Sequence, residues 1–336
     1  MKSYNVAVAG VTGNVGYEVC RVLEDYNFPV NNFYPIASEK SKNKDIRFHK
    51  KNYKCLTMDD VDFSNVDILF NAAGSEFASE FAEDVAEMGC LVIDKTSYFR
   101  MNSEVPLSVP EINGDETAIK YKQKNIISIP NCVAIPTACA IDKLNKSFGV
   151  TFANLSTYQS VSGAGAKAMN SLYDGTKRYF EARFLDKSED EYAGKIPFNC
   201  IPENGEIMEN GYTTEEDKII NEIKRLINPN LPVSATSVRV PVFRGHAISL
   251  TVGLEEKFDI NDVIEIFKED ANFFVHNDKA SLTHKDCVGT DLTYLSRIRK
   301  DLCFPNTISM YIVADNLRKG AAFTAVQSAR KILGII

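Results

Sequence analysis

The residue of this chain best suited to chemistry is Cys132, which lies in the run IPNCVAIP over residues 129–136. We expect a buried strand over 125–129 and a helix shortly after the cysteine, because Pro136 is tolerated in the first turn of a helix and not in its interior. The N-terminus of a helix favours a thiolate over a thiol. The position therefore predicts a nucleophile for covalent catalysis at a carbonyl carbon, and the alternative is a small buried hydrophobic residue.

Polar side chains near other expected strand and helix ends could assist such a thiolate. His246 is one of only four histidines, and a histidine titrates near neutral pH. Glu215 and Lys218 stand three residues apart, so on a helix they could simply form a surface pair. Thr213 with Glu216 indicates a capping box at the start of that helix. The candidates, each of which could instead be an ordinary structural residue, are Arg100, Gln159, Glu215, Lys218, Arg239 and His246.

A glycine-punctuated turn predicts the binding of a dinucleotide. The sequence GVTGNVG occupies residues 10–16, after an apolar strand over 4–9 and at the start of an amphipathic helix over 15–26. Glycines let the backbone approach a pyrophosphate, and the helix N-terminus supplies N–H donors. The spacing is G-x-x-G-x-x-G and not the commoner G-x-G-x-x-G, so a plain tight turn is the alternative. The residues predicted to bind the cofactor here are Gly10, Thr12, Gly13, Asn14, Val15 and Gly16.

The choice between NAD and NADP is expected at the end of the second strand, which we place over 33–37. An acidic residue there binds the ribose hydroxyls of NAD, whereas NADP needs positive or hydroxyl groups for its 2′-phosphate. Ser38, Lys40 and Ser41 could hold that phosphate, and Glu39 opposes it unless its carboxylate points to solvent. The balance favours NADP(H) as the cofactor.

The first half of the chain alternates between apolar strands and helices. This pattern predicts a parallel sheet covered on both faces, and therefore a Rossmann-type, doubly wound α/β fold. From about residue 151 the strands are longer and richer in β-branched residues, which predicts an α+β domain with a mostly antiparallel sheet. Further strands are expected over 66–72, 90–94, 151–161, 234–241, 247–254, 292–298 and 307–314, and further helices over 76–88, 166–183, 214–227 and 261–269.

A C-terminal helix over 317–333 has a small apolar face that could pack back on the first domain. We therefore assign residues 1–132 and 316–336 to a nucleotide-binding domain and residues 133–315 to a second, catalytic domain. A stretch with Pro and Gly over 194–211 indicates a long irregular loop, and loops of that length are often functional.

Composition argues against several classes of protein. With 38 Lys and Arg against 45 Asp and Glu, the formal net charge is −7 and there is no dense basic block, so nucleic acid is not expected as a partner. The eight cysteines show no C-x-x-C spacing, so we expect no metal site and reduced thiols in the cytoplasm. We expect neither a signal peptide nor a membrane span, because no apolar run approaches the roughly 20 residues that cross a bilayer.

Five blocks of the chain together resemble the aspartate-β-semialdehyde dehydrogenase family in order and spacing, over essentially the whole length. They are the glycine turn, PNC over 130–132, YQSVSGAG over 158–165, RVPV and GH within 239–246, and DNLRKGAA over 315–322. The resemblance implies NADPH-dependent reductive dephosphorylation of L-aspartyl 4-phosphate to L-aspartate 4-semialdehyde and phosphate, a step toward lysine, diaminopimelate, threonine and methionine. It also implies a homodimer, with the second domain serving in dimerisation.

The resemblance suggests a role for each candidate residue. Cys132 would be the nucleophile that forms a thioester, His246 the general acid and base, and Gln159 the residue that orients the substrate or the thiolate. Arg239 would hold the α-carboxylate, for which a planar guanidinium is suited, and Glu215 would pair with the α-ammonium. Arg100, Lys218 and Asn131 would bind phosphate, and Ser162, Gly163, Gly165 and Asn316 would lie near the nicotinamide.

The chain departs from the family pattern at three positions. Val133 stands where a Ser or Thr usually follows the nucleophile, and Lys95 replaces a small polar residue. Lys40 replaces an Arg near the cofactor phosphate, which would weaken the NADP preference.

Two other functions stay open: a related reductase for another acyl phosphate, such as N-acetylglutamyl phosphate, and a non-catalytic nucleotide-binding protein. Glu215 argues against the former, because an acetylated amine carries no charge for a carboxylate to bind. Cys132 and His246 argue against the latter, which needs neither a nucleophile nor a base.

Overall fold

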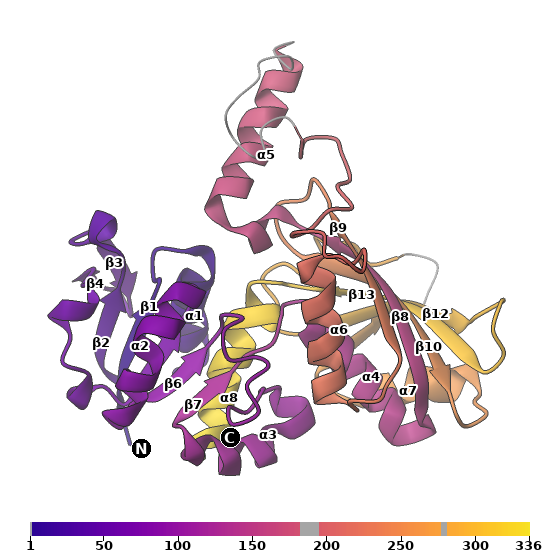
Figure 1. The fold of residues 1–336 in the computed structure, drawn as a ribbon, viewed down its shortest axis with the longest axis horizontal. Helices are drawn as coiled ribbons and strands as arrows, with labels where there is room; N and C mark the ends of the chain where they lie inside the picture. The colour runs from indigo at the N-terminus through magenta and orange to yellow at the C-terminus, as the bar shows by residue number, and fades with distance from the viewer. Residues whose placement is uncertain (1, 182–194, 277–280) are drawn as a thin grey trace. The chain divides into compact units, whose positions relative to one another are not determined.

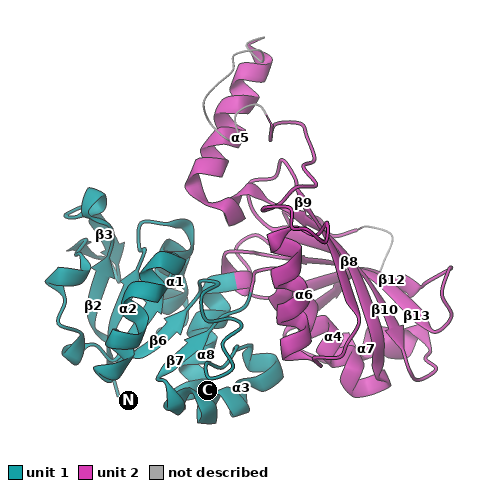
Figure 2. Cartoon of the chain, in the orientation of Figure 1, with its two compact units in different colours: residues 1–130, 321–336 teal, residues 131–320 magenta. Residues whose placement is uncertain are grey.

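The chain divides into two compact units, which Figure 2 colours separately. The computed structural model describes residues 2–181, 195–276 and 281–336. Unit 1 comprises Met1–Pro130 and Ala321–Ile336, and unit 2 comprises Asn131–Gly320. Among the described residues, no helix has the length and apolar character needed to cross a membrane.

A five-stranded parallel sheet forms the centre of unit 1, in the order β2-β1-β5-β6-β7 (Figure 1). Three of its strands are wholly buried, as the apolar runs predicted. The first strand has the bounds expected from the sequence, and the Rossmann-like fold class is confirmed. The strands are β1 (Tyr4–Ala9), β2 (Val30–Ile36), β5 (Ile68–Asn71), β6 (Leu91–Asp94) and β7 (Ile126–Ser128).

The helices of unit 1 bury their small residues on this sheet and on one another. Ala78 and Ala82 of α2 join the same core as Ala7 and Ala9 of β1. The last helix, α8, packs beside α1 and α3, where the hydroxyls of Ser108 and Ser328 lie 3.0 Å apart. A π-helical turn over Arg318–Ala322 precedes α8, where the sequence predicted one continuous helix. These helices are α1 (Asn14–Asp25), α2 (Ser75–Glu87), α3 (Pro110–Lys120) and α8 (Phe323–Ile332).

Two elements of unit 1 were not predicted. The hairpin of β3 (Asp45–Phe48) and β4 (Lys51–Lys54) turns through His49 and Lys50 with φ of 45° and 62°, so it lacks the glycine that usually marks such a turn. Helix α3 contains a kink at Asn113, whose φ of −136° interrupts the helical spacing of apolar residues. Neither element therefore has a clear periodic signal in the sequence.

A six-stranded mixed sheet forms the centre of unit 2, in the order β11-β12-β13-β10-β8-β9. Three of its five pairings are antiparallel, and the two at the edges, β11 with β12 and β8 with β9, are parallel. The α+β class of this part is confirmed, although the short edge strand β11 was not predicted. The strands are β8 (Val150–Gln159), β9 (Val233–Arg239), β10 (His246–Leu254), β11 (Phe273–His276), β12 (Thr293–Lys300) and β13 (Thr307–Ala314).

The predicted helices of unit 2 are present. Helix α4 packs on β8, β10 and β13, while α6 packs on β9 and α4. The capping box of α6 is confirmed, because the Thr213 hydroxyl accepts from the Glu216 N–H and the Glu216 carboxylate accepts from the Thr213 N–H. The predicted ends at 182–183 of one helix and 194 of the long loop lie outside the described residues. These helices are α4 (Ala134–Phe148), α5 (Gly165–Phe180), α6 (Thr214–Leu226) and α7 (Ile260–Lys268).

Candidate active site

The register of the unit 2 sheet brings the ends of four strands into one row. His246, the first residue of β10, lies opposite Gln159 at the end of β8 and opposite Ala314 at the end of β13. Gln159 in turn lies opposite Arg239 at the end of β9. Three candidate residues that are far apart in the sequence therefore meet at one end of this sheet.

His246 is almost fully buried, and one nitrogen of its ring is already engaged. Its Nδ1 accepts a hydrogen bond from the Ser160 backbone N–H at 3.0 Å and lies 3.1 Å from the Ser160 hydroxyl. A neutral imidazole that accepts at Nδ1 carries its proton at Nε2. Burial, and then the positive charge of Arg239, lower the pKa of His246 to about 3, so the ring is neutral near pH 7.

The Nε2 side of His246 faces a glycine, Gly163. Nε2 is buried and has no hydrogen-bond partner among the described residues. A Cβ added at Gly163 would lie 3.1 Å from this nitrogen and 3.5 Å from Nη1 of Arg239. A buried N–H without a partner is costly, so this donor is suited to bind a group that enters the site.

Gln159 and Arg239 are held together by a residue that was not predicted, Asn204. The Asn204 amide donates to Oε1 of Gln159 at 3.0 Å, and its carbonyl oxygen accepts from Nη2 of Arg239 at 2.6 Å. Nε2 of Gln159 donates to the Ser237 hydroxyl at 2.9 Å, and Nη1 of Arg239 donates to the Ser160 carbonyl at 2.8 Å. Both predicted substrate-contacting side chains are therefore fixed in orientation.

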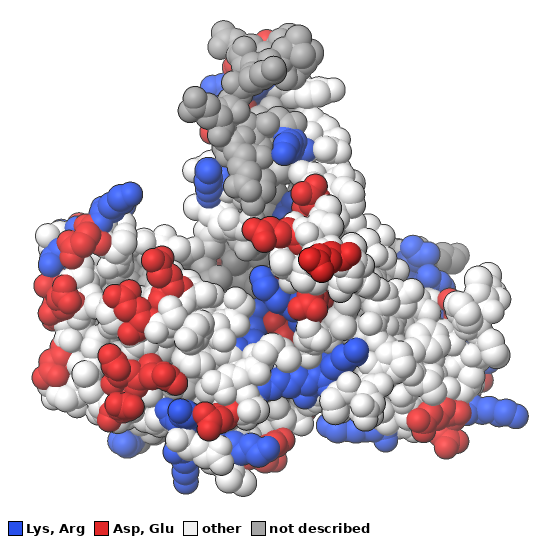
Figure 3. Space-filling view, in the orientation of Figure 1, with Lys and Arg blue, Asp and Glu red and all other residues white. Residues whose placement is uncertain are grey.

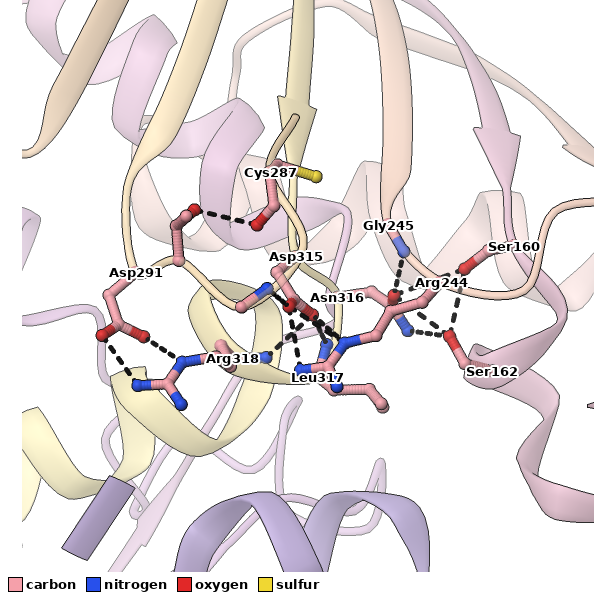
Figure 4. Close-up of polar contacts among 12 residues, drawn as sticks. Ser160, Ser162, Arg244, Gly245, Cys287, Asp291, Asp315, Asn316, Leu317 and Arg318 are labelled. Carbon is pink, nitrogen blue, oxygen red and sulfur yellow. Dashed lines mark hydrogen bonds and ion pairs between the residues drawn. The ribbon is translucent and has the colours of Figure 1, made fainter. Parts of the chain in front are cut away.

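The segment that follows β13 is anchored by a buried carboxylate (Figure 4). Asp315 is wholly buried and forms an ion pair with Arg244 at 2.9 Å. It also accepts from the backbone N–H groups of Gly289 at 2.7 Å, Leu317 at 3.0 Å and Arg318 at 3.3 Å. One side chain thus holds two stretches of backbone and the Arg244 guanidinium, close to the first residue of β10.

Asn316 connects this anchor to the surroundings of His246. Its carbonyl oxygen accepts from the Gly245 N–H at 2.9 Å and lies within 3.3 Å of the hydroxyls of Ser160 and Ser162 (Figure 4). Ser160 is the residue that hydrogen-bonds the His246 ring. Asn316, a polar residue of the DNLRKGAA block, therefore contacts the serine that holds the imidazole of His246.

The same segment also contacts Cys132. A Cβ added at Gly320 would lie 2.8 Å from the Cβ of Cys132, so only a glycine allows this approach. The Gly320 N–H donates to the carbonyl of Asp315 at 2.9 Å. The segment 315–320 is therefore in contact at one end with the residues that hold His246 and at the other end with the cysteine.

Cys132 lies two residues before α4, close to the helix N-terminus that the sequence predicted, and it is half-buried. The preceding Asn131 has its side-chain oxygen bonded to the Val133 N–H at 2.8 Å and its amide bonded to Glu215 at 2.9 Å. Its backbone N–H donates to the buried Glu222, which was not predicted. Helix α6 therefore fixes the loop that carries the thiol.

Lys218 follows Glu215 by about one turn of α6 and is half-buried. The predicted binding residues Asn131 and Glu215 are thus in direct contact, and Lys218 lies on the same helix.

Arg100 belongs to unit 1, where it is buried against backbone carbonyls. Its Nε donates to the carbonyl of Ile129 at 3.0 Å, and Nη2 donates to that of Lys95 at 2.9 Å. The Lys95 ammonium donates to the carbonyl of Pro130. Both cations therefore hold the backbone just before Cys132. This contact is a structural role for Lys95, which stands where the family pattern has a small polar residue.

A cavity of about 550 Å³ in unit 1 adjoins the predicted cofactor turn. Gly10, Thr12 and Gly13 line it, together with Ser38 at the end of β2. Gly10 has a φ of +75°, and a Cβ on Gly16 would lie 2.3 Å from the Gly10 carbonyl oxygen, so glycines permit this turn and its close contact with α1. In the part of the chain that the structure describes, no side chain caps the N-terminus of α1, which fits a turn that binds pyrophosphate.

Five other predicted cofactor residues do not line this cavity. Asn14, Val15, Gly16, Lys40 and Ser41 are not among the residues that line this cavity, and Ser41 is buried.

The nicotinamide candidates belong to unit 2. Ser162 and Asn316 hydrogen-bond each other, Gly163 adjoins His246, and Gly165 begins α5. All four therefore lie in or against the turn that follows β8.

Sequence reasoning missed several residues of both sites. Asn204 lies in the irregular loop over 194–211, for which only the length suggested a function. Asp315 lies in the DNLRKGAA block over 315–322. The sequence therefore gave a weak indication for both residues. The sequence gave no indication of one part of the cavity wall, because separate stretches of chain form it only after folding. This part consists of Thr57, Met58, Phe77 and Phe81.

Comparison with known proteins gives matches over both parts of the chain. Residues 5–120 match a family model described as "Semialdehyde dehydrogenase, NAD binding domain", and residues 142–319 match "Semialdehyde dehydrogenase, dimerisation domain". An aspartate-semialdehyde dehydrogenase of Rickettsia bellii is 43% identical over 99% of this chain and 98% of its own. The corresponding protein of Aquifex aeolicus is 38% identical over 98% of each chain.

Solved structures give the same result. The crystal structure of aspartate semialdehyde dehydrogenase II from Vibrio cholerae, complexed with ASA, covers 99% of both chains with a TM-score of 0.96 and 35% identity. A probable aspartate-semialdehyde dehydrogenase from Pseudomonas aeruginosa has a TM-score of 0.93 at 28% identity, again over 99% of both chains. The match to an NAD binding domain supports a nicotinamide cofactor for this chain.

Proposed function

This chain belongs to the aspartate-semialdehyde dehydrogenase family, and we propose that it reduces L-aspartyl 4-phosphate to L-aspartate 4-semialdehyde through a thioester on Cys132, with release of phosphate. The family resemblance favours NADPH as the reductant. One observation carries the proposal: the segment 315–320 touches Cys132 through Gly320 and the support of His246 through Asn316. Nucleophile and proton donor thus share one support within unit 2.

The first step is attack of the Cys132 thiolate on the acyl carbon of the substrate. A C–S bond forms, the bond from that carbon to the phosphate oxygen breaks, and phosphate leaves with the electron pair. A nicotinamide cofactor, when bound, would supply the hydride that converts the resulting thioester into the anion of a thiohemiacetal. The C–S bond of this anion then breaks, which returns an electron pair to sulfur and releases the aldehyde.

His246 acts in these steps through Nε2. Because Nδ1 accepts from the Ser160 N–H, the neutral ring presents Nε2–H as a donor. This donor stabilises negative charge on sulfur or on the thiohemiacetal oxygen by a hydrogen bond.

The charged residues of unit 2 bind the amino-acid part of the substrate. Arg239, oriented by Asn204 and the Ser160 carbonyl, binds the α-carboxylate. Glu215 binds the α-ammonium, and Asn131 with Lys218 binds phosphate. We assign Arg100 the role of holding the carbonyl of Ile129, three residues before the nucleophile.

We further propose that the chain works as a homodimer, since residues 142–319 match a dimerisation domain. All eight cysteines lie in the described residues and none is in a disulfide, which fits the reducing cytoplasm and a role in lysine, threonine and methionine synthesis.

The test is phosphate-dependent reduction of NADP⁺ by the purified protein with aspartate semialdehyde. Cys132→Ala should lower kcat by more than about a thousandfold while cofactor binding is retained. The wild-type protein should form a thioester that mass spectrometry detects at Cys132. The matched control is Cys200→Ala, which removes an exposed thiol and should leave turnover unchanged. Normal turnover of the Cys132→Ala protein would refute the mechanism.

A further inference from the structure

The loop over 284–291 lies against the ends of two strands that carry the candidate catalytic residues. A Cβ added at Gly245, directly before β10, would lie 2.6 Å from the carbonyl oxygen of His284 and 3.1 Å from the sulfur of Cys287. Nε2 of the His284 ring lies 3.1 Å from the carbonyl oxygen of Tyr158 in β8. Cys287 is fully buried by this packing. The loop is therefore in close contact with the backbone that supports the imidazole.

The same loop carries a carboxylate that binds the segment 315–320. Nε of Arg318 donates to Oδ1 of Asp291 at 2.8 Å, and Nη2 donates to Oδ2 at 3.0 Å (Figure 4). Such a two-pronged pair fixes the plane of a guanidinium as well as its distance. The side chain of Arg318 is only 5% exposed and that of Asp291 15%. Solvent and salt therefore screen this ion pair less than they screen an exposed one.

Arg318 is the first residue of the π-helical turn that contacts the nucleophile. The turn extends over Arg318–Ala322 and includes Gly320, at which an added Cβ would lie 2.8 Å from the Cβ of Cys132. Single π-helical turns are rare, and they occur frequently at functional sites. The ion pair with Asp291 therefore fixes this turn at its first residue, two positions before the contact with the cysteine.

We propose that Asp291 is a positioning residue for the nucleophile: it holds Arg318, and through the π-helical turn it keeps Gly320 against Cys132. The inference rests on the proposed function for the reaction, and it adds a residue that acts only through another side chain. Asp315 fixes the start of the segment, near the imidazole, so Asp291 acts at the end nearer the thiol. Without Asp291 the guanidinium loses its partner, and the turn no longer restrains the cysteine.

The experiment combines steady-state kinetics with site-resolved alkylation of the cysteines in the full chain. Asp291→Asn keeps the size of the side chain and removes the charge that pairs with Arg318. Its kcat should fall by about tenfold, because small displacements of a nucleophile are costly. KM for aspartate semialdehyde should stay within about twofold of the wild-type value. The network that Asn204 forms with Gln159 and Arg239 is not changed by this substitution.

Alkylation without substrate measures the restraint on the thiol directly. Iodoacetamide should modify Cys132 of the Asp291→Asn protein about threefold faster, or more, than it modifies Cys132 of the wild type. Cys139, which is buried in α4, is the internal reference for global unfolding and should react equally slowly in both proteins. A protein that was merely destabilised would expose both thiols.

Two further variants separate the pair from the fold. Asp291→Glu retains the carboxylate, so it should recover most of the lost kcat. Arg318→Lys retains the positive charge but lacks the planar guanidinium, so it should behave like Asp291→Asn. Arg318→Lys also provides the test if the Asp291→Asn protein does not fold.

The matched control breaks a different partly buried ion pair of unit 2. Asp270 lies 3.3 Å from the Lys143 ammonium, and the two side chains are 22% and 30% exposed. Asp270→Asn should leave kcat and the alkylation of Cys132 unchanged.

A second control tests the change in net charge. Acidic side chains gather over the α2 side of unit 1 in Figure 3, and Glu87 is an exposed carboxylate at the end of α2. Glu87→Gln changes the net charge by the same amount as Asp291→Asn. It should alter neither the kinetics nor the alkylation.

Three results for Asp291→Asn would overturn the inference: an unchanged kcat, a lower kcat without faster alkylation of Cys132, or faster alkylation of Cys139 together with Cys132. The proposed function fails separately. If Cys132 becomes more reactive as expected but the wild-type protein does not reduce NADP⁺ with aspartate semialdehyde and phosphate, the reaction assignment is wrong and the positioning role of Asp291 stands.

Discussion

The two sites of this molecule are built in different ways. The cofactor cavity of unit 1 is formed by a glycine turn, by residues that follow β2 and by helix α2, and several of its side chains are exposed. The row at the end of the unit 2 sheet is formed by buried side chains, several of which make two or more hydrogen bonds. The difference teaches that single exposed side chains can change in the cofactor cavity, whereas the catalytic row depends on a connected network.

The largest expected effect comes from removal of the buried carboxylate of Asp315, which tests this contrast directly. Asp315→Ala leaves the Arg244 guanidinium and three backbone N–H groups without their acceptor. Breaking a buried ion pair in this way costs about 3–5 kcal/mol, so the melting temperature should drop by several degrees. Calorimetry of the purified variant measures this drop.

The matched control is Asp115→Ala in unit 1. Asp115 pairs with Lys331 at 2.7 Å, but its side chain is 92% exposed. Exposed pairs contribute about 0–1 kcal/mol, so this variant should melt close to the wild type. Equal effects of the two substitutions would show that the contrast between a buried network and an adaptable surface is mistaken.

A weaker effect should come from pH, through the buried imidazole. The unfolded chain protonates this group near its ordinary pKa of about 6.5, but the folded chain does so only near pH 3. Between these values the unfolded state binds more protons, so the free energy of unfolding falls as the pH falls. At about pH 5 the loss reaches about 2 kcal/mol at most.

His246→Asn removes this titration and retains a group that can accept from the Ser160 N–H. The melting temperature of the wild type should therefore fall more between pH 7 and pH 5 than that of the variant. His49→Asn, at an exposed histidine of unit 1, should behave like the wild type. Parallel pH curves for the wild type and His246→Asn would contradict the burial argument.

The smallest effect is expected from the residue that joins Gln159 to Arg239. Asn204→Ala removes the acceptor of one Arg239 N–H and the donor to Gln159. Loss of this positioning should lower kcat/KM for aspartate semialdehyde by about tenfold, which corresponds to about 1.4 kcal/mol.

Two readouts identify the cause of that change. KM for the amino-acid substrate should rise while KM for the cofactor stays constant, because the network lies in unit 2. The control is Asn199→Ala, an exposed asparagine bonded to the Lys195 carbonyl. An increase of the cofactor KM instead would place Asn204 outside the substrate-binding network.

Much of the fold was predictable because it depends on local patterns. β1 and β13 have the bounds expected from their apolar runs, and the capping box of α6 marks its first turn. The hairpin β3–β4 was missed because its turn uses His49 and Lys50 in left-handed conformations without a glycine. Local patterns identify elements with strong periodicity and fail for short, exposed ones.

By itself the sequence determined the thiol before a helix, the glycine turn after the first strand and the alternation of elements that yields a parallel sheet. These are properties of residues close together in the chain. Only the tertiary structure decided that strand register aligns His246, Gln159 and Arg239, that Asn204 joins two of them, and that carboxylates from three elements share the cofactor cavity. Such contacts form between segments that are distant in sequence, so their geometry exists only after the chain has folded.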